Sequence, residues 1–140
     1  MRRSIFHYLI VLALFAVTSA CGNDLTTTPT DTTPPPATTK VFSGTIDRNG
    51  AFTHPFTAAR SGSVTVTLSA LNPDNTLTIG LSLGTWNGES CQTVIARDST
   101  VVGNSIVGTA SSSGNFCIRV YDAASRLTEP TSYDVQVVHP

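Results

Sequence analysis

The chain has 140 residues, of which 12% are charged and 40% hydrophobic, and its formal net charge is −1. This length suits one folded domain, and the lack of a basic patch excludes nucleic acid as a partner. No apolar run reaches the roughly 18 residues of a transmembrane helix, so a conventional spanning helix is not predicted.

Residues 1–20 have the three-part plan of a secretory signal peptide. Arg2 and Arg3 form a short positive segment, a mostly apolar stretch covers 5–17, and small residues precede Cys21. A signal peptide is removed on export and takes no part in the fold. A buried or membrane helix is the alternative interpretation, but the apolar stretch is short for one.

The residues before Cys21 resemble a bacterial lipobox, the sequence cut by lipoprotein signal peptidase. Ser19 and Ala20 fit the family pattern, whereas Thr18 stands where Leu is preferred. The resemblance implies cleavage after Ala20, a diacylglycerol on the Cys21 thiol and acylation of the new amine, for instance with palmitate. Several acyl chains anchor a protein stably in a membrane. The alternative is an ordinary cleavage nearby that leaves Cys21 as a free thiol.

The residue after the cysteine bears on the destination of the protein. In cells with two membranes, Asp at this place retains lipoproteins at the inner membrane, and this chain has Gly22 instead. The resemblance therefore implies a lipid-anchored, extracytoplasmic protein of the cell envelope, at the outer membrane if the organism is diderm.

Residues 21–40 are predicted to be a tether that follows the lipidated cysteine. The segment from Asn23 to Lys40 consists almost entirely of Thr, Pro and Asp. It cannot bury enough apolar surface to fold, and the run Pro34-Pro35-Pro36 favours an extended chain. We expect a disordered, semi-stiff spacer, with a proline-rich ligand for a partner protein as the alternative.

Residues 41–140 are predicted to form an all-β domain. The clearest signal lies in the third segment, where Val64, Val66 and Leu68 alternate with polar residues, as in a strand with one buried face. Eight short strands are predicted, at Lys40–Ile46, Ala51–Thr57, Ser63–Leu71, Leu77–Leu83, Val94–Arg97, Ser105–Thr109, Phe116–Asp122 and Tyr133–Val137. Pro55 places the second strand at a sheet edge or a bulge. Eight strands and no convincing helix predict an antiparallel β-sandwich or jelly roll.

Cys91 and Cys117 are predicted to form a disulfide, because export places the domain in an oxidising space. The bond would close a loop of 25 intervening residues, which is worth about 3.5 kcal/mol in the chain-entropy model. Cys117 alternates with the core positions of its strand, so we expect the bridge at the surface or an edge of the sandwich. Two free thiols are the alternative, and no CxxC or nearby histidine supports a metal site.

The domain resembles the bacterial pre-peptidase C-terminal family. The resemblance rests on Phe42-Ser43-Gly44-Thr45-Ile46, Phe52-Thr53-His54-Pro55-Phe56-Thr57, Ser61 to Leu68, Ser113 to Tyr121 and Tyr133-Asp134-Val135-Gln136-Val137. It implies a noncatalytic jelly-roll sandwich. The chain departs from the family in two ways: an anchor and tether replace the preceding peptidase, and 76–79 reads TLTI where an acidic pair is common. The second departure speaks against calcium binding there.

One motif resembles a catalytic signature. The stretch Gly80 to Gly84 matches the G-x-S-x-G nucleophile pattern, which works only at a strand-to-helix turn followed by an acid and a histidine. Here Ser82 lies inside an alternating strand, and the one later histidine is His139 near the end of the chain. We predict no catalytic residue, and a hydrolase that uses Ser82 is a distant alternative.

The other titratable residues suggest no metal or cofactor. His54 stands alone inside the domain and is interpreted as a surface or edge residue. Four acids lack the spacing of a calcium loop and are interpreted as solvated turn and strand residues: Asp98, Asp122, Glu129 and Asp134.

The candidate ligand-binding residues centre on Trp86. It lies in the predicted polar loop 85–90 with Asn87 and Glu89, where its ring could stack on a sugar. The alternative is that Trp86 packs back onto the end of the sandwich. Arg119 and Tyr121 are predicted on the outward face of their strand as a second contact surface.

These observations predict a noncatalytic, membrane-anchored binding or adhesion module for a polysaccharide or an envelope protein. The alternative is a structural accessory subunit of an envelope or secreted-protein complex.

Overall fold

The computed structural model describes residues 36–140. The predicted signal peptide, Cys21 and the tether as far as residue 35 lie outside the described residues. Within residues 36–140 there is no helix, and hence none long and apolar enough to cross a membrane. The eight strands are β1 (Thr38–Ile46), β2 (Ala51–Ala58), β3 (Gly62–Asn72), β4 (Ile79–Trp86), β5 (Cys91–Thr100), β6 (Ser105–Ala110), β7 (Gly114–Tyr121) and β8 (Thr131–His139).

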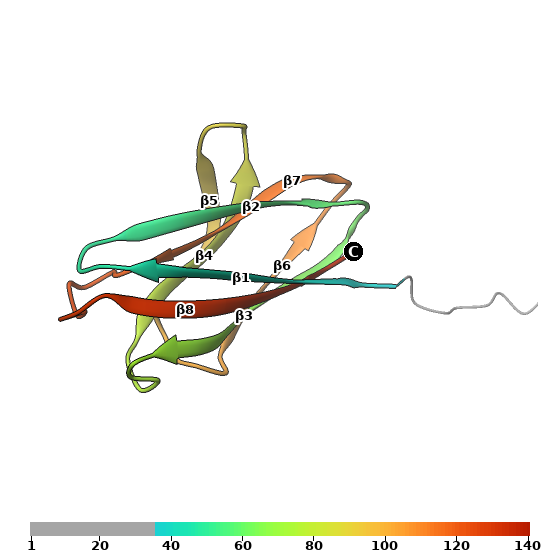
Figure 1. The fold of residues 1–140 in the computed structure, drawn as a ribbon. Coiled ribbons are helices and arrows are strands. Elements are labelled where there is room, and N and C mark those ends of the chain that lie inside the picture. The colour runs from blue at the N-terminus through green and yellow to red at the C-terminus, as the bar shows by residue number, and fades with distance from the viewer. Residues whose placement is uncertain (1–35) are drawn as a thin grey trace, which may run out of the picture. The chain divides into compact units, whose positions relative to one another are not determined.

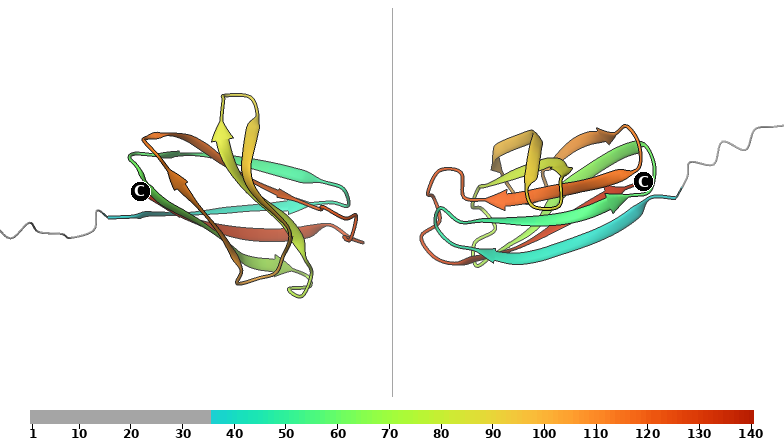
Figure 2. Two further views of the ribbon diagram at one scale, coloured as in Figure 1. Left: turned by 180° about the vertical axis from the view of Figure 1, so that it is seen from behind. Right: turned by 90° about the horizontal axis from the view of Figure 1, so that it is seen from above.

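The strands form two antiparallel sheets of four, which confirms the predicted sandwich. Sheet A has the order β1-β8-β3-β6 and sheet B the order β2-β7-β4-β5. The pairing is therefore nested: the first strand pairs with the last, the second with the seventh, and so on inward, as β1–β8, β2–β7, β3–β6 and β4–β5. This is the pairing of one long hairpin that turns between β4 and β5 and is rolled up. This is the strand order of a jelly roll, and Figures 1 and 2 show its two layers.

The core lies between the two sheets and follows from alternation along the strands. In β3 the buried residues Val64, Val66 and Leu68 alternate with more exposed polar ones, and β8 repeats the pattern from Tyr133 to Val137. Successive side chains of a strand point to opposite faces, so each sheet offers one apolar face to the other. Sheet B contributes residues such as Ile118 and Val120.

Each strand differs from its predicted extent by one to three residues at one or both ends, and β1 and β5 are the cases that bear on the argument. β1 begins at Thr38, so the last three residues assigned to the tether belong to it, and β5 covers Cys91–Thr100 instead of Val94–Arg97. β5 is an edge strand whose side chains are mostly exposed, so its sequence shows no alternation. Pro55 lies in β2, the other edge of sheet B, where its missing N–H interrupts no ladder.

Asp122 is buried at 7% exposed, so its interpretation as a solvated residue was wrong. Its carboxylate accepts hydrogen bonds from the backbone N–H groups of Asn49 (3.1 Å), Arg126 (2.9 Å) and Leu127 (3.3 Å), and its own N–H donates to the Gly50 carbonyl (3.0 Å). Burial alone would raise the pKa of Asp122, but the backbone donors outweigh it and lower the pKa. The residue ties the β1–β2 turn to the β7–β8 loop.

Candidate functional site

The disulfide positions the outer face of sheet B. Cys91 and Cys117 are bonded, with their Cα atoms 5.7 Å apart, which confirms the predicted pair. Cys91 begins β5 and Cys117 lies in the middle of β7, with β4 between these strands in the sheet. Cys117 stands outside the core cluster, as expected, but it is completely buried. The bridge thus lies at the edge strand β5 and outside the core, as expected, with Cys91 half-buried and Cys117 covered.

Two glycines of β4 allow its backbone to approach the neighbouring strands β5 and β7 closely. The register of β4 and β5 shifts between Leu83 and Gly84, and a Cβ at Gly84 would overlap the carbonyl oxygen of Gln92. A Cβ at Gly80 would likewise overlap the ring of Tyr121. In Figure 1 the tip of this hairpin rises past β2 and β7. Both glycines of the G-x-S-x-G motif thus serve close packing on the outer face.

Ser82 lies between these two glycines and is 2% exposed. Its hydroxyl has no hydrogen-bond partner among residues 36–140, so no histidine of the described part activates it. A serine nucleophile needs both an adjacent base and access to substrate. This arrangement supplies neither.

Trp86 is the last residue of β4. The sequence had instead suggested that it lies in a loop, with packing onto the end of the sandwich as the alternative. Trp86 is half-buried and lies over the outer face of sheet B, between two hollows. The first, which we call the Arg119 hollow, has a volume of about 300 Å³ and is lined by Thr53, Trp86, Glu89, Ser90, Cys91 and Arg119. The second, the Asn115 hollow, has a volume of about 440 Å³ and is lined by Lys40, Pro55, Phe56, Thr57, Trp86, Gly88 and Asn115.

The floor of both hollows is set by the register of β2 and β7. Three cross-strand pairs face outward in order: Thr53 with Arg119, Pro55 with Cys117, and Thr57 with Asn115. Each outer pair lines one hollow, Pro55 of the middle pair lines the Asn115 hollow, and Trp86 lines both hollows. Four residues of rise along β2 make this floor about 13 Å long.

Arg119 is exposed but held in place by its neighbours. Its guanidinium carbon lies 5.5 Å from the centre of the Tyr121 ring, a cation–π contact. The Tyr121 hydroxyl donates to the Asp98 carboxylate at 2.6 Å. Burial, together with this carboxylate, raises the pKa of Tyr121 to about 12. Tyr121 therefore stays neutral and acts as a fixed support for the arginine.

The predicted loop residues have different roles. The side-chain oxygen of Asn87 accepts hydrogen bonds from the N–H groups of Glu89 (2.9 Å) and Ser90 (2.7 Å), so Asn87 builds the hairpin turn and lines neither hollow. Of the residues predicted from sequence, Trp86, Glu89 and Arg119 meet in one hollow. Thr53 and Asn115 were not predicted, because only the register of β2 and β7 brings them to this face. Lys40 was not predicted because it comes from β1 in sheet A, and Ser90 was not selected within its loop.

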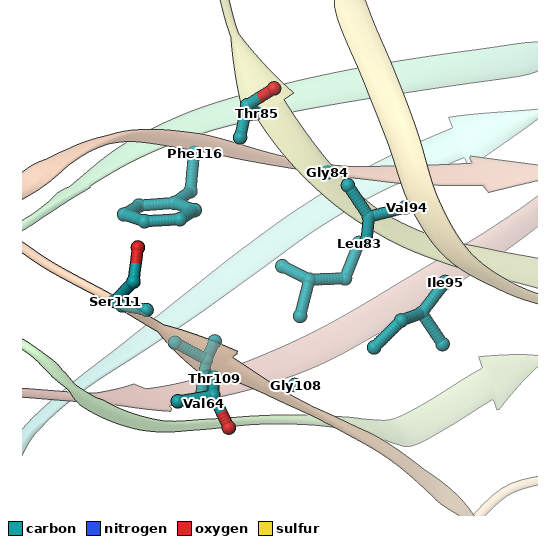
Figure 3. Close-up of a pocket in the computed structure, with 11 residues that line it drawn as sticks. Val64, Leu83, Gly84, Thr85, Val94, Ile95, Gly108, Thr109, Ser111 and Phe116 are labelled. Atoms are coloured by element: carbon teal, nitrogen blue, oxygen red, sulfur yellow. The ribbon is translucent and has the colours of Figure 1, made fainter.

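A separate apolar cleft lies between β5 and β6, the edge strands of the two sheets (Figure 3). Its volume is about 140 Å³. Leu83, Ile95 and Phe116 point into it, and its side-chain polar groups are the hydroxyls of Thr85, Thr109 and Ser111. With no charged group in its lining, this cleft offers an apolar contact but little that would orient a polar ligand.

An aromatic cluster fills the opposite edge, between β1 and β2. The Nε2 atom of His54 lies 2.9 Å from the Tyr133 hydroxyl, and the His54 ring stacks on Phe42 with centres 5.0 Å apart. Phe52 lies 5.2 Å from the same ring. Burial lowers the pKa of His54. Its contacts are those of an edge residue that packs, and residues 36–140 contain no cluster of three metal-binding side chains.

No model of a known protein family matches the chain, and no curated protein is similar to it. Function is therefore inferred from the geometry of the site and from the sequence.

Proposed function

We propose that the protein is a lipid-anchored extracytoplasmic binding module that takes carbohydrate on the outer face of sheet B. The observation that carries this proposal is the position of Trp86 between two hollows lined with hydroxyl, amide and charged groups. An aromatic ring offers an apolar face with polar groups nearby, which suits the C–H face of a sugar ring and its hydroxyls. A floor of about 13 Å suits an oligosaccharide better than one sugar ring.

The site is fixed before any ligand arrives. The Cys91–Cys117 bond and the close approach at Gly84 hold the β4–β5 hairpin over β7. The Asn87 side chain closes its turn. A site that is already ordered loses less conformational entropy when a ligand binds. A shallow surface of this kind can therefore reach a measurable affinity.

The binding proposal is tested by replacing Trp86. Trp86→Ala should weaken glycan binding about tenfold or more, because the stacking contact is lost, and Trp86→Phe should retain part of it. Binding is measured on a glycan array and then by calorimetry. Val94→Ala is the control, since Val94 is 72% exposed on the same hairpin and lines neither hollow. Equal affinity of wild type and Trp86→Ala for every glycan that binds would refute the carbohydrate proposal.

We also propose that the module is noncatalytic. The buried, unpartnered hydroxyl of Ser82 supports this. A fluorophosphonate probe should leave Ser82 unlabelled in the folded protein. Covalent labelling of Ser82 would instead favour the hydrolase alternative.

The anchor is proposed from the sequence, since Cys21 lies outside the described residues. We expect labelled palmitate to be incorporated into the wild type and not into Cys21→Ser, and the wild type to fractionate with the outer membrane if the cell is diderm. Incorporation that persists in Cys21→Ser would contradict lipidation at this residue. Membership of the pre-peptidase C-terminal family also remains a proposal, supported by the strand motifs.

An accessory subunit of an envelope complex is the second candidate. It is favoured by large apolar side chains left exposed on the edge strands β1 and β2, with Val41 60% and Phe52 51% exposed. Crosslinking in cells separates the two functions. A protein partner recovered in equal amount, and lost in Phe52→Ser but not in Trp86→Ala, would favour the accessory role.

A further inference from the structure

We infer that the ligand of the outer face of sheet B is an acidic glycan, and that Arg119 pairs with a carboxylate on the sugar next to Trp86. This inference rests on the carbohydrate function proposed above and specifies the class of carbohydrate.

The state of Arg119 is the first step. Its guanidinium rests against Tyr121, whose hydroxyl is held by Asp98. Within residues 36–140, Arg119 has no hydrogen-bond or ion-pair partner of its own. The side chain is thus restricted on one face, and its N–H groups are free to meet a ligand. Asp98 is already engaged by the tyrosine, so it does not neutralise the arginine through a direct bond.

The chemistry of the partner follows from the guanidinium. Its planar arrangement of donors matches the two oxygens of a carboxylate, and such paired hydrogen bonds are stronger than neutral ones. Trp86 lines the same hollow, so one sugar acid can stack on the indole ring and place its carboxylate on the guanidinium. A uronate residue carries both features on one ring.

The second hollow suggests that the ligand is a polymer of sugar acids and not a single one. Lys40 lines the Asn115 hollow, so each of the two hollows contains one cation. A polyuronate repeats its carboxylate along the chain and would meet a cation in both. Glu89 lines the Arg119 hollow and opposes the approach of a carboxylate, which predicts that its charge limits affinity.

The experiment compares polygalacturonate and alginate with the same polymers after chemical reduction of their carboxylates. The wild type should bind the acidic form about tenfold more tightly than the reduced form, and the preference should shrink as salt rises. Arg119→Gln should bind both forms as the wild type binds the reduced one. Glu89→Gln should increase the preference for the acidic form.

Arg48→Gln is the matched control. Arg48 is exposed in the β1–β2 turn, lines neither hollow, and its loss changes the net charge by the same amount. This variant should keep the full preference. If Arg48→Gln and Arg119→Gln lose the preference equally, long-range charge explains it and the inference is wrong.

The remaining outcomes separate this inference from the function on which it rests. If the wild type binds acidic and reduced polymers equally and Trp86→Ala weakens both, the carbohydrate function stands and the acidic specificity is refuted. If the wild type binds no acidic or neutral glycan, both are refuted.

Discussion

At the scale of single residues, the buried Asp122 and the partly buried His54 show how polar groups act in this domain. Asp122 gathers backbone N–H groups from two loops, and His54 makes its one polar contact with Tyr133 inside an aromatic cluster. The first residue is stabilised in its charged form and the second in its neutral form. Their effects on stability therefore have different dependences on pH.

Asp122→Ala should lower the free energy of unfolding by about 3 kcal/mol, because buried N–H groups lose a charged acceptor. Asp122→Asn keeps one acceptor oxygen and should cost less. Since the pKa of Asp122 is lowered on folding, its contribution is present above its unfolded pKa of about 3.9 and is lost as pH falls through the folded value. Urea unfolding of the wild type and Asp122→Asn at neutral and acid pH measures both effects. Equal acid sensitivity of the two proteins would contradict the assignment.

His54 should make the domain less stable as pH falls through about 6.5, the pKa of an unperturbed histidine. The pKa of His54 is lower in the folded state, so below this pH the unfolded state binds more protons and is favoured. In His54→Phe the melting temperature should change less between neutral and mildly acidic pH. Identical pH profiles for the two proteins would contradict this role of His54.

At the scale of elements, the β4–β5 hairpin decides where the candidate site lies. The alternation of apolar residues predicted the strands that have a buried face, because each of them carries the signal in its own sequence. β5 carries almost none of it. The close approach of β4 and β5 at Gly84 depends on a register shift between these two strands. No local pattern in the sequence predicts such a shift. Trp86 was therefore recognised from its residue type but placed in the wrong position.

The same hairpin gives the disulfide a role in the proposed binding as well as in stability. Replacing Cys91 and Cys117 with Ala should lower the free energy of unfolding by about 3.5 kcal/mol. It should also weaken glycan binding under conditions where the protein stays folded, because the start of β5 is released from β7. Calorimetry on the folded variant tests the second effect. Undiminished binding would mean that the contact at Gly84 alone holds Trp86.

At the scale of the whole molecule, the fold was predictable as a class but its pairing was not. Turn clusters and strand count indicate a sandwich or jelly roll, yet they do not determine which strands are neighbours. Thr53 and Arg119 meet only because β2 pairs with β7. The candidate site combines these strands with the β4–β5 hairpin, so sequence alone yielded some of its members and not the surface they form.

The central place of β8 gives a prediction at this scale. β8 lies between β1 and β3 in sheet A and supplies core residues such as Val135 and Val137. A chain that ends before Thr131 should therefore be unfolded, as judged by circular dichroism and amide NMR spectra. A chain that begins at residue 36 should keep the melting temperature of the longer protein. A folded truncated chain would show that sheet A does not depend on β8.

The nested pairing of strands has a further consequence for the export route proposed above. Of the strand pairs in residues 36–140, only β4–β5 joins strands that are consecutive in the chain. The first strand, β1, pairs with the last strand, β8. Contacts between distant parts of a chain slow folding. On the export route proposed here, the segment that leaves the cytoplasm first cannot find its partner until the last segment has crossed. On that proposed route the domain would travel in an unfolded state, and its sandwich would close only on the far side of the membrane.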